Sequence, residues 1–147
     1  MLLSKEFAVY LNLAACKLKQ YTALAFKQND LDLTPEQFLL VDLLWNNGSM
    51  SQQRLADMMH KDKNSITKFV DGLEKKQMVR RKQDPNDRRS NLIILTPKAE
   101  AMKSQAKEKG ISMLDDILTG ISDSEIRAFL DTLEKITKNM DALSDRL

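Results

Sequence analysis

Residues 51–95 constrain the fold of this chain more than any other part of the sequence. A short amphipathic stretch is followed by a second one at residues 62–76, and then by two runs rich in β-branched and apolar residues. The second stretch predicts a helix, because its apolar residues recur at spacings of three and four and would face inward together. These inward residues are Ile66, Phe69, Val70 and Leu73.

The other face of this predicted helix carries short polar and basic side chains over its first two turns. They are Lys63, Asn64, Ser65, Thr67 and Lys68. Amides and hydroxyls fit the edges of DNA bases, and lysines fit phosphates, so the set is suited to reading a duplex. The alternative is a polar face that only meets water.

Two predicted strands follow, at residues 78–82 and 91–95, and the Pro and Asn/Asp content of residues 83–90 favours a turn between them. The hairpin would carry Arg88 and Arg89 near its tip. Before the polar helix, Ser51 is expected to cap a short helix that turns Leu55, Met58 and Met59 inward, with His60-Lys61 as the connecting turn. Two helices joined by so short a turn, followed by a hairpin, predict a winged helix-turn-helix within a mostly helical α+β fold.

The sequence resembles the MarR family of bacterial winged-helix transcription regulators over nearly the whole chain. The motifs that carry the resemblance are, in chain order, D-K-N-S-I-T-K, L-E-K-K, V-x-R, D-P-N-D-R-R-S and L-T-P-K-A. Asp87-Arg88-Arg89, after Asp84-Pro85 and before Leu95-Thr96, is the most specific part. Two positions depart from the family pattern, which usually has Gly at Gln77 and at Ala99. Gln77 would follow the polar helix at a position that often needs a positive φ, which a non-glycine residue adopts with some strain.

The resemblance implies that Arg88 and Arg89 belong to a DNA-contacting wing, and that Arg89 enters the minor groove with Asp87 orienting it. The alternative is that both arginines are solvated turn residues. Arg81 and Lys82 are expected to meet phosphates. It also implies a homodimer on a pseudo-palindromic DNA site, usually a repressor, with a possible small-molecule effector between the dimer helices and the winged domain. Tyr21, Phe38 and Trp45 are candidates for the effector cleft, although such aromatics are more often core residues.

Helices are expected on both sides of the winged segment. The first, about residues 4–28, places apolar residues at alternating spacings of four and three. Thr34-Pro35 with Gln37, and Ser122 with Glu125, predict capped helix starts. The last helix keeps an apolar stripe to its end, which requires a partner. Residues 1–30 and 97–147 are therefore predicted to form a dimerisation region, and residues 31–96 the DNA-binding domain. The apolar stripe of the last helix comprises Ile126, Phe129, Leu133, Ile136, Met140, Leu143 and Leu147.

Charge is divided unevenly along the chain, although the net charge is only +2. Residues 61–90 carry ten basic and five acidic side chains, whereas residues 111–147 carry four basic and eight acidic ones. Positive charge is therefore concentrated where the polar helix and the hairpin are predicted, as binding to a polyanion requires.

Other functional classes find little support in the sequence. One histidine, His60, and the lack of catalytic or phosphate-loop motifs argue against an enzyme, and one Cys and one His argue against a zinc site. No cofactor is expected. Without a spanning apolar run or a signal sequence, we expect a cytoplasmic protein that does not enter a membrane.

Two alternatives stay open at this point. The lone Cys16 is expected to be a small hydrophobe, and the alternative is a redox-responsive regulator, with Lys17 and Lys19 as the nearby cations. The other alternative is a winged-helix protein-interaction module that has lost specific DNA binding and uses its basic face on an acidic partner.

Overall fold

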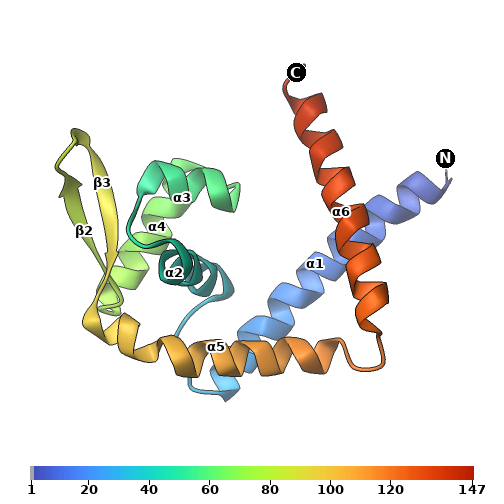
Figure 1. Cartoon of the computed structure of the whole chain (residues 1–147), viewed down its shortest axis with the longest axis horizontal. Coiled ribbons are helices and arrows are strands. Elements are labelled where there is room, and N and C mark those ends of the chain that lie inside the picture. Colours follow the sequence, from blue (N-terminus) through green and yellow to red (C-terminus); the bar gives the residue numbers. More distant parts are fainter. Residues whose placement is uncertain (1) are drawn as a thin grey trace. The chain divides into compact units, whose positions relative to one another are not determined.

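The computed structural model describes residues 2–147 and has the mostly helical α+β architecture that the sequence predicts (Figure 1). The chain divides into two compact units, the first ending at Ile111 and the second comprising Ser112–Leu147. The elements in chain order are α1 (Leu2–Gln28), α2 (Pro35–Asn47), β1 (Met50–Ser51), α3 (Gln52–Met59), α4 (Lys63–Lys75), β2 (Val79–Asp84), β3 (Asp87–Leu95), α5 (Pro97–Ile117) and α6 (Asp123–Ser144).

Local capping signals set where most of these helices begin. Thr34 and Gln37 form the predicted capping box at α2, with Pro35 in the first turn. Ser51 accepts a hydrogen bond from the backbone of Arg54 at the start of α3. Such caps satisfy backbone N–H groups that have no partner within the helix, and each contributes about 1 kcal/mol.

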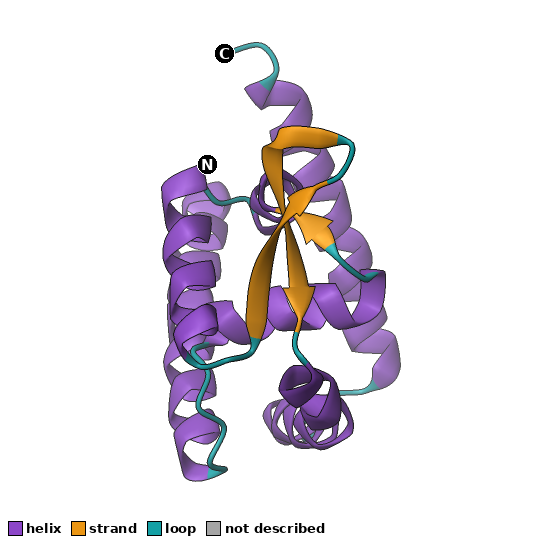
Figure 2. Ribbon diagram, turned by 90° about the vertical axis from the view of Figure 1, so that its left-hand side faces the viewer, coloured by secondary structure: helices purple, strands orange, loops and turns teal. Residues whose placement is uncertain are grey.

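The hairpin is longer and its turn tighter than predicted. β2 runs to Asp84 and β3 begins at Asp87, so only Pro85 and Asn86 lie between the strands. The prediction that residues 83–90 form the turn is therefore wrong, because residues 88–90 lie in β3. The strand order β1-β3-β2 also includes a short strand that the sequence did not reveal, in which Met50 pairs with Ile93 (Figure 2).

The core of the first unit lies between α2, α3, α4 and the sheet. Leu40, Leu55, Ile66, Val70, Leu73 and Ile93 are completely buried. Within α3, Ala56 is buried and Met58 is exposed, so the prediction that Met58 faces inward is wrong; Phe69 of α4 is only half-buried. Gln77 has the predicted positive φ, 59°, just after α4.

The start of α5 belongs to this core rather than to a separate region. Ala99 and Ala106 are completely buried, and the indole Nε1 of Trp45 donates a hydrogen bond to the carbonyl oxygen of Ala99 at 3.2 Å. The compact units divide after Ile111, within α5, and the predicted functional division into a DNA-binding domain and a dimerisation region stays a prediction. Gly110 lies inside the continuous helix α5 and faces the ring of Phe38.

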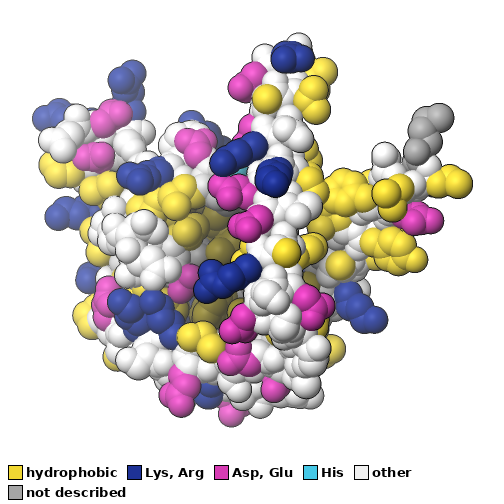
Figure 3. All heavy atoms as spheres, turned by 45° about the vertical axis from the view of Figure 1, so that its right-hand side comes forward, with side chains coloured by type: hydrophobic (Ala, Val, Ile, Leu, Met, Phe, Trp, Pro, Cys, Tyr) yellow, Lys and Arg dark blue, Asp and Glu magenta, His cyan; other side chains and the backbone are white. Residues whose placement is uncertain are grey.

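The second unit is dominated by α6, which starts at the predicted Ser122–Glu125 capping box and buries none of its residues. Phe129 and Leu143 of its apolar stripe are each more than half exposed. Charged side chains of both signs cover the face of α6 that Figure 3 shows, and hydrophobic ones gather on the N-terminal part of α1. Each helix thus exposes an apolar surface.

Candidate nucleic-acid interface

Helix α4 presents the predicted polar face while its apolar stripe anchors it. Ile66, Val70 and Leu73 are completely buried, whereas Lys63, Asn64 and other polar residues of the first turns are exposed. Asp62 caps the helix by accepting a hydrogen bond from the backbone N–H of Ser65 at 2.7 Å. This bond, and a second one from the Ser65 side chain, hold the pKa of Asp62 below its usual value, so the cap is ionised at neutral pH.

The hydroxyl group of Thr67 already takes part in hydrogen bonds within the protein, although the residue is exposed. Its hydroxyl donates to the carbonyl oxygen of Lys63 at 2.9 Å and accepts from Nε2 of Gln52 at 3.3 Å. Gln52 lies at the start of α3, so this contact ties the two helices of the helix-turn-helix together. Ser65 is half-buried. Lys63, Asn64 and Lys68 are therefore the most accessible of the five residues predicted on this face.

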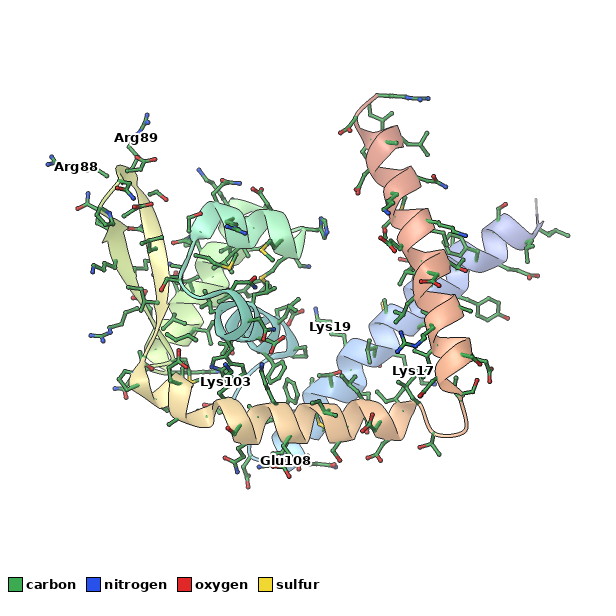
Figure 4. All side chains as sticks on the ribbon, viewed as in Figure 1. Lys17, Lys19, Arg88, Arg89, Lys103 and Glu108 are labelled. Atoms are coloured by element: carbon green, nitrogen blue, oxygen red, sulfur yellow. The ribbon has the colours of Figure 1, made fainter. Side chains whose placement is uncertain are left out.

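The wing places Arg88 and Arg89 at its tip, pointing away from the fold (Figure 4). The Asp87 carboxylate accepts a hydrogen bond from the backbone N–H of Arg89 at 3.0 Å, and its Oδ1 lies 3.5 Å from Nε of Arg89. The Arg89 side chain is 94% exposed. The geometry thus brings together the two residues that the resemblance paired, and leaves the guanidinium open to a ligand.

Arg81 is placed differently from the prediction that it meets phosphates. Its guanidinium forms ion pairs with Asp71, at 2.8 Å, and with Glu74, and its Nε donates to Oε1 of Gln52 at 3.1 Å. The side chain is only 24% exposed. These internal partners correct the expectation, because the guanidinium is already engaged; the neighbouring Lys82 is exposed.

A groove of about 670 Å³ runs between the two helices and the wing. Of the residues proposed from the sequence, Lys63, Thr67, Arg81, Asp87 and Arg89 line it. Gln52, Gln53, Asp71, Ser90 and Asn91 line it as well and were missed. The two glutamines could have been found from the sequence, since they follow the Ser51 cap at the start of a helix. Ser90 and Asn91 could not, because their position in the groove depends on the length of β3.

Two of the three effector candidates pack against each other. Phe38 lies between Phe26 and Trp45, with ring centroids 5.0 and 6.1 Å away, and the Trp45 side chain is buried with its N–H satisfied. Trp45 therefore belongs to the core, whereas Phe38 is half-buried. Tyr21 is 39% exposed on α1.

Cys16 is exposed on α1, and one of its expected cationic neighbours is engaged elsewhere. Nζ of Lys19 lies 2.5 Å from Oε1 of Glu36 on α2. This hydrogen bond and the charge of Glu36 raise the pKa of Lys19. Burial opposes ionisation of Glu36, but its bonds to Lys19 and to its own backbone outweigh burial and lower its pKa.

Among residues 2–147, no helix is both long enough and apolar enough to cross a membrane.

His60 ends α3 in the left-handed conformation, with φ 53°. Its backbone N–H donates to the last turn of the helix, so it serves as the turn residue that the sequence predicts.

Comparison with known proteins places this fold among regulators. A family model described as the MarR family matches residues 33–90. The HTH-type transcriptional regulator YsmB of Bacillus subtilis is 30% identical over 112 residues, which cover 76% of this chain and 77% of that protein.

Solved structures show the same fold. A MarR transcriptional regulator from Methanosarcina mazei superimposes with a TM-score of 0.82 at 19% identity, covering 95% of this chain and 99% of that one. A mutant of MarR from Escherichia coli, in complex with operator DNA, gives a TM-score of 0.81 at 20% identity, covering 89% and 93% of the two chains. The likeness extends beyond the winged segment to the flanking helices.

Proposed function

Because this chain belongs to the MarR family of winged helix-turn-helix transcription regulators, we propose that it binds a two-fold symmetric DNA operator as a homodimer and represses transcription there. The observation that carries the proposal is the groove between α4 and the wing, where base-reading and phosphate-binding side chains meet. Regulators of this family are not enzymes, and no catalytic step is part of the mechanism.

The chemistry of the groove favours DNA over a merely acidic protein partner. A partner recognised by charge alone needs only lysines and arginines, whereas Asn64 and the glutamines of α3 can exchange specific hydrogen bonds with base edges. In the proposed complex α4 enters the major groove, with Lys63, Asn64, Ser65, Thr67 and Lys68 nearest the bases and phosphates. Lys82 and Arg88 lie toward the backbone, and Arg89, held by Asp87, reaches the adjacent minor groove.

The relative from Escherichia coli that was crystallised with operator DNA supports this arrangement by its fold. A two-fold dimer would present two α4 helices to successive major grooves, about 34 Å apart. Repression follows if the occupied site overlaps the binding site of RNA polymerase.

Release by a small-molecule effector is a further part of the proposal. An effector that binds one dimer conformation better than another would change the spacing of the two α4 helices and hence the affinity for the operator. We retain Tyr21, which is exposed, and Phe38, which is half-buried, for direct contact; the buried Trp45 would act only through the core.

Selection of bound sequences from a random duplex pool, with affinity measured against salt, tests the function. We expect enrichment of a two-fold symmetric site and a steep decrease of affinity with salt. Salt-sensitive binding without enrichment would reject the proposal and favour the protein-interaction module. Peroxide treatment tests the redox alternative. If peroxide changes the affinity of the wild type for the selected site but not that of Cys16→Ser, the protein is a redox-responsive regulator.

The variants Lys68→Ala and Arg89→Ala are expected to weaken binding to the selected site by about tenfold each. The two losses should differ in kind. Lys68→Ala should lower affinity for all sequences and reduce the salt dependence, whereas Arg89→Ala should keep the preference for central bases and lose that for the flanks. Fluorescence anisotropy with labelled duplexes measures both.

Lys135→Ala, on the acidic α6, is the matched control and should bind as the wild type does. Wild-type affinity in both Lys68→Ala and Arg89→Ala would contradict the assignment of these residues to the interface.

A further inference from the structure

Arg81 occupies the point where the wing leaves the body of the first unit. Along β2 the side chains alternate, so Val79 is buried, Arg80 and Lys82 are exposed, and Arg81 turns back toward the helices. Beyond Arg81, no side chain of the hairpin between Lys82 and Asn91 hydrogen-bonds to α3 or α4 in the described residues. Arg81 is thus the outermost polar attachment of the wing to the helix-turn-helix.

All three guanidinium nitrogens of Arg81 take part in this attachment. Nη2 lies 2.8 Å from Oδ1 of Asp71 and also donates to the carbonyl oxygen of Thr67 at 3.4 Å. Nη1 pairs with Glu74, and Nε donates to Gln52 at 3.1 Å. The planar fork of arginine can reach these separate acceptors at once, whereas the ammonium of lysine cannot do so in the same geometry.

The charges at this point make a phosphate contact by Arg81 unfavourable. Asp71 and Glu74 together carry two negative charges beside a groove in which DNA is proposed to bind, and Arg81 supplies one positive charge between them. If Arg81 turned toward a phosphate, it would leave both carboxylates unpaired near a polyanion. The internal arrangement is therefore favoured, because leaving charged groups without their hydrogen-bond partner costs free energy.

We propose that Arg81 is a positioning residue that fixes the wing relative to α4 and α3, so that Arg89 at the tip is held in register with the bases that α4 reads. The antiparallel ladder transmits this constraint, since Arg81 pairs with Ile93 and the same two strands continue to the turn at Asp84 and Asp87. This role rests on the proposed function for its effect on DNA, but the anchoring itself is a property of the free protein.

The double variant Asp71→Ala/Glu74→Ala distinguishes anchoring from electrostatics, because the two predict opposite results. Removing two negative charges from a DNA-binding face strengthens binding if charge alone matters. If the carboxylates hold Arg81, their loss frees the wing. We expect the preference for the flanking bases of the selected site to fall about tenfold, while binding to unrelated duplex does not weaken.

Arg81→Lys tests the same role with the charge retained. We expect Arg81→Lys to reduce the preference for the flanking bases of the selected site. In a protein that already carries Arg89→Ala, the same substitution should have no further effect, because Arg81 acts through Arg89. An arginine that contacted phosphate directly would give losses that add in the double variant. Arg80→Lys, exposed on the same strand, is the matched control and should leave the flanking preference unchanged.

Hydrogen exchange without DNA separates this inference from the proposed function. In Arg81→Lys and in the double carboxylate variant, backbone amides of residues 82–91 should exchange several-fold faster than in the wild type, with α2 unchanged. Unchanged wing exchange would overturn the anchoring role even if the operator is found. Faster exchange with no selected operator would leave the anchor standing and reject the DNA-binding proposal instead.

Discussion

Replacing Phe129 and Leu143 with glutamate is expected to convert the proposed dimer to a monomer and to weaken binding to the two-fold DNA site about 100-fold or more. Both side chains lie on the apolar stripe of α6 and are 59% and 58% exposed. In a dimer, binding of one winged domain to its half-site holds the other close to the second half-site. This gain in effective concentration is lost when the subunits separate. Contacts within each groove would stay intact.

The apolar stripe is the reason why we propose that α6 packs against a second chain. None of its residues is buried, and an isolated helix of this length gains little stability in water from its backbone alone. Burial of a large apolar side chain contributes about 1.5–3 kcal/mol, so several such residues on α6 and α1 can stabilise a dimer. Glutamate at these positions would have to be buried as a charge, which costs more than the burial gains.

A matched control uses positions next to the same residues. Ala128 and Ala142 are exposed and are turned away from the stripe, so glutamate at both adds the same charge without entering the proposed interface. Sedimentation velocity at micromolar concentration should show a monomer for the first variant and a dimer for the control. A wild-type chain that sediments as a monomer would contradict the dimer directly.

Local features of the sequence were sufficient to predict much of the fold. The caps at Thr34, Ser51 and Ser122 depend on a hydrogen bond that spans three residues, so they can be recognised from a short window. The buried stripe of α4 follows from its period, and the positive φ of Gln77 from the helix end before it. Such features do not depend on where the rest of the chain lies.

The errors arose where distant segments decide the outcome. The two-residue strand β1 exists only because Ser51 and its neighbour Met50 meet β3, and no pattern within so short a segment reveals that pairing. The length of β3 likewise depends on the ladder with β2, which extends past the arginines. Met58 has the same apolar character as Met59, and only the packing of α3 shows which of the two faces the core.

The candidate site shows the same limit for charged residues. A run such as Arg80-Arg81-Lys82 predicts a basic surface, but the sequence does not tell which member is paired inside the protein. Arg81 meets Asp71 and Glu74 because the turn at Gln77 brings β2 back beside the end of α4. Its neighbours keep the exposed positions that charge patterning predicts.

Gly72→Ala is expected to destabilise the first unit by about 1–3 kcal/mol, although alanine is favoured over glycine inside a helix by about 1 kcal/mol. The reason lies in α2. A Cβ atom at residue 72 would lie 2.6 Å from Nε2 of Gln37, a side chain that is itself buried. Oε1 of Gln37 accepts hydrogen bonds from the backbone N–H of Thr34 at 3.1 Å and from Nζ of Lys76 at 2.7 Å.

Gln37 therefore cannot move aside without weakening both the cap of α2 and its link to the end of α4. If that conflict is the cause, Gly72→Ala should become stabilising once Gln37 is alanine, because only the helix preference then remains. Gly110→Ala is the control: its Cβ would meet Phe38 at 3.4 Å, an ordinary contact, so it should be neutral or stabilising. Urea unfolding at one fixed protein concentration measures all four variants, since the proposed dimerisation would make stability depend on concentration. A loss of stability that persists in the Gln37→Ala background would show that the approach of Gln37 is not what requires glycine in α4.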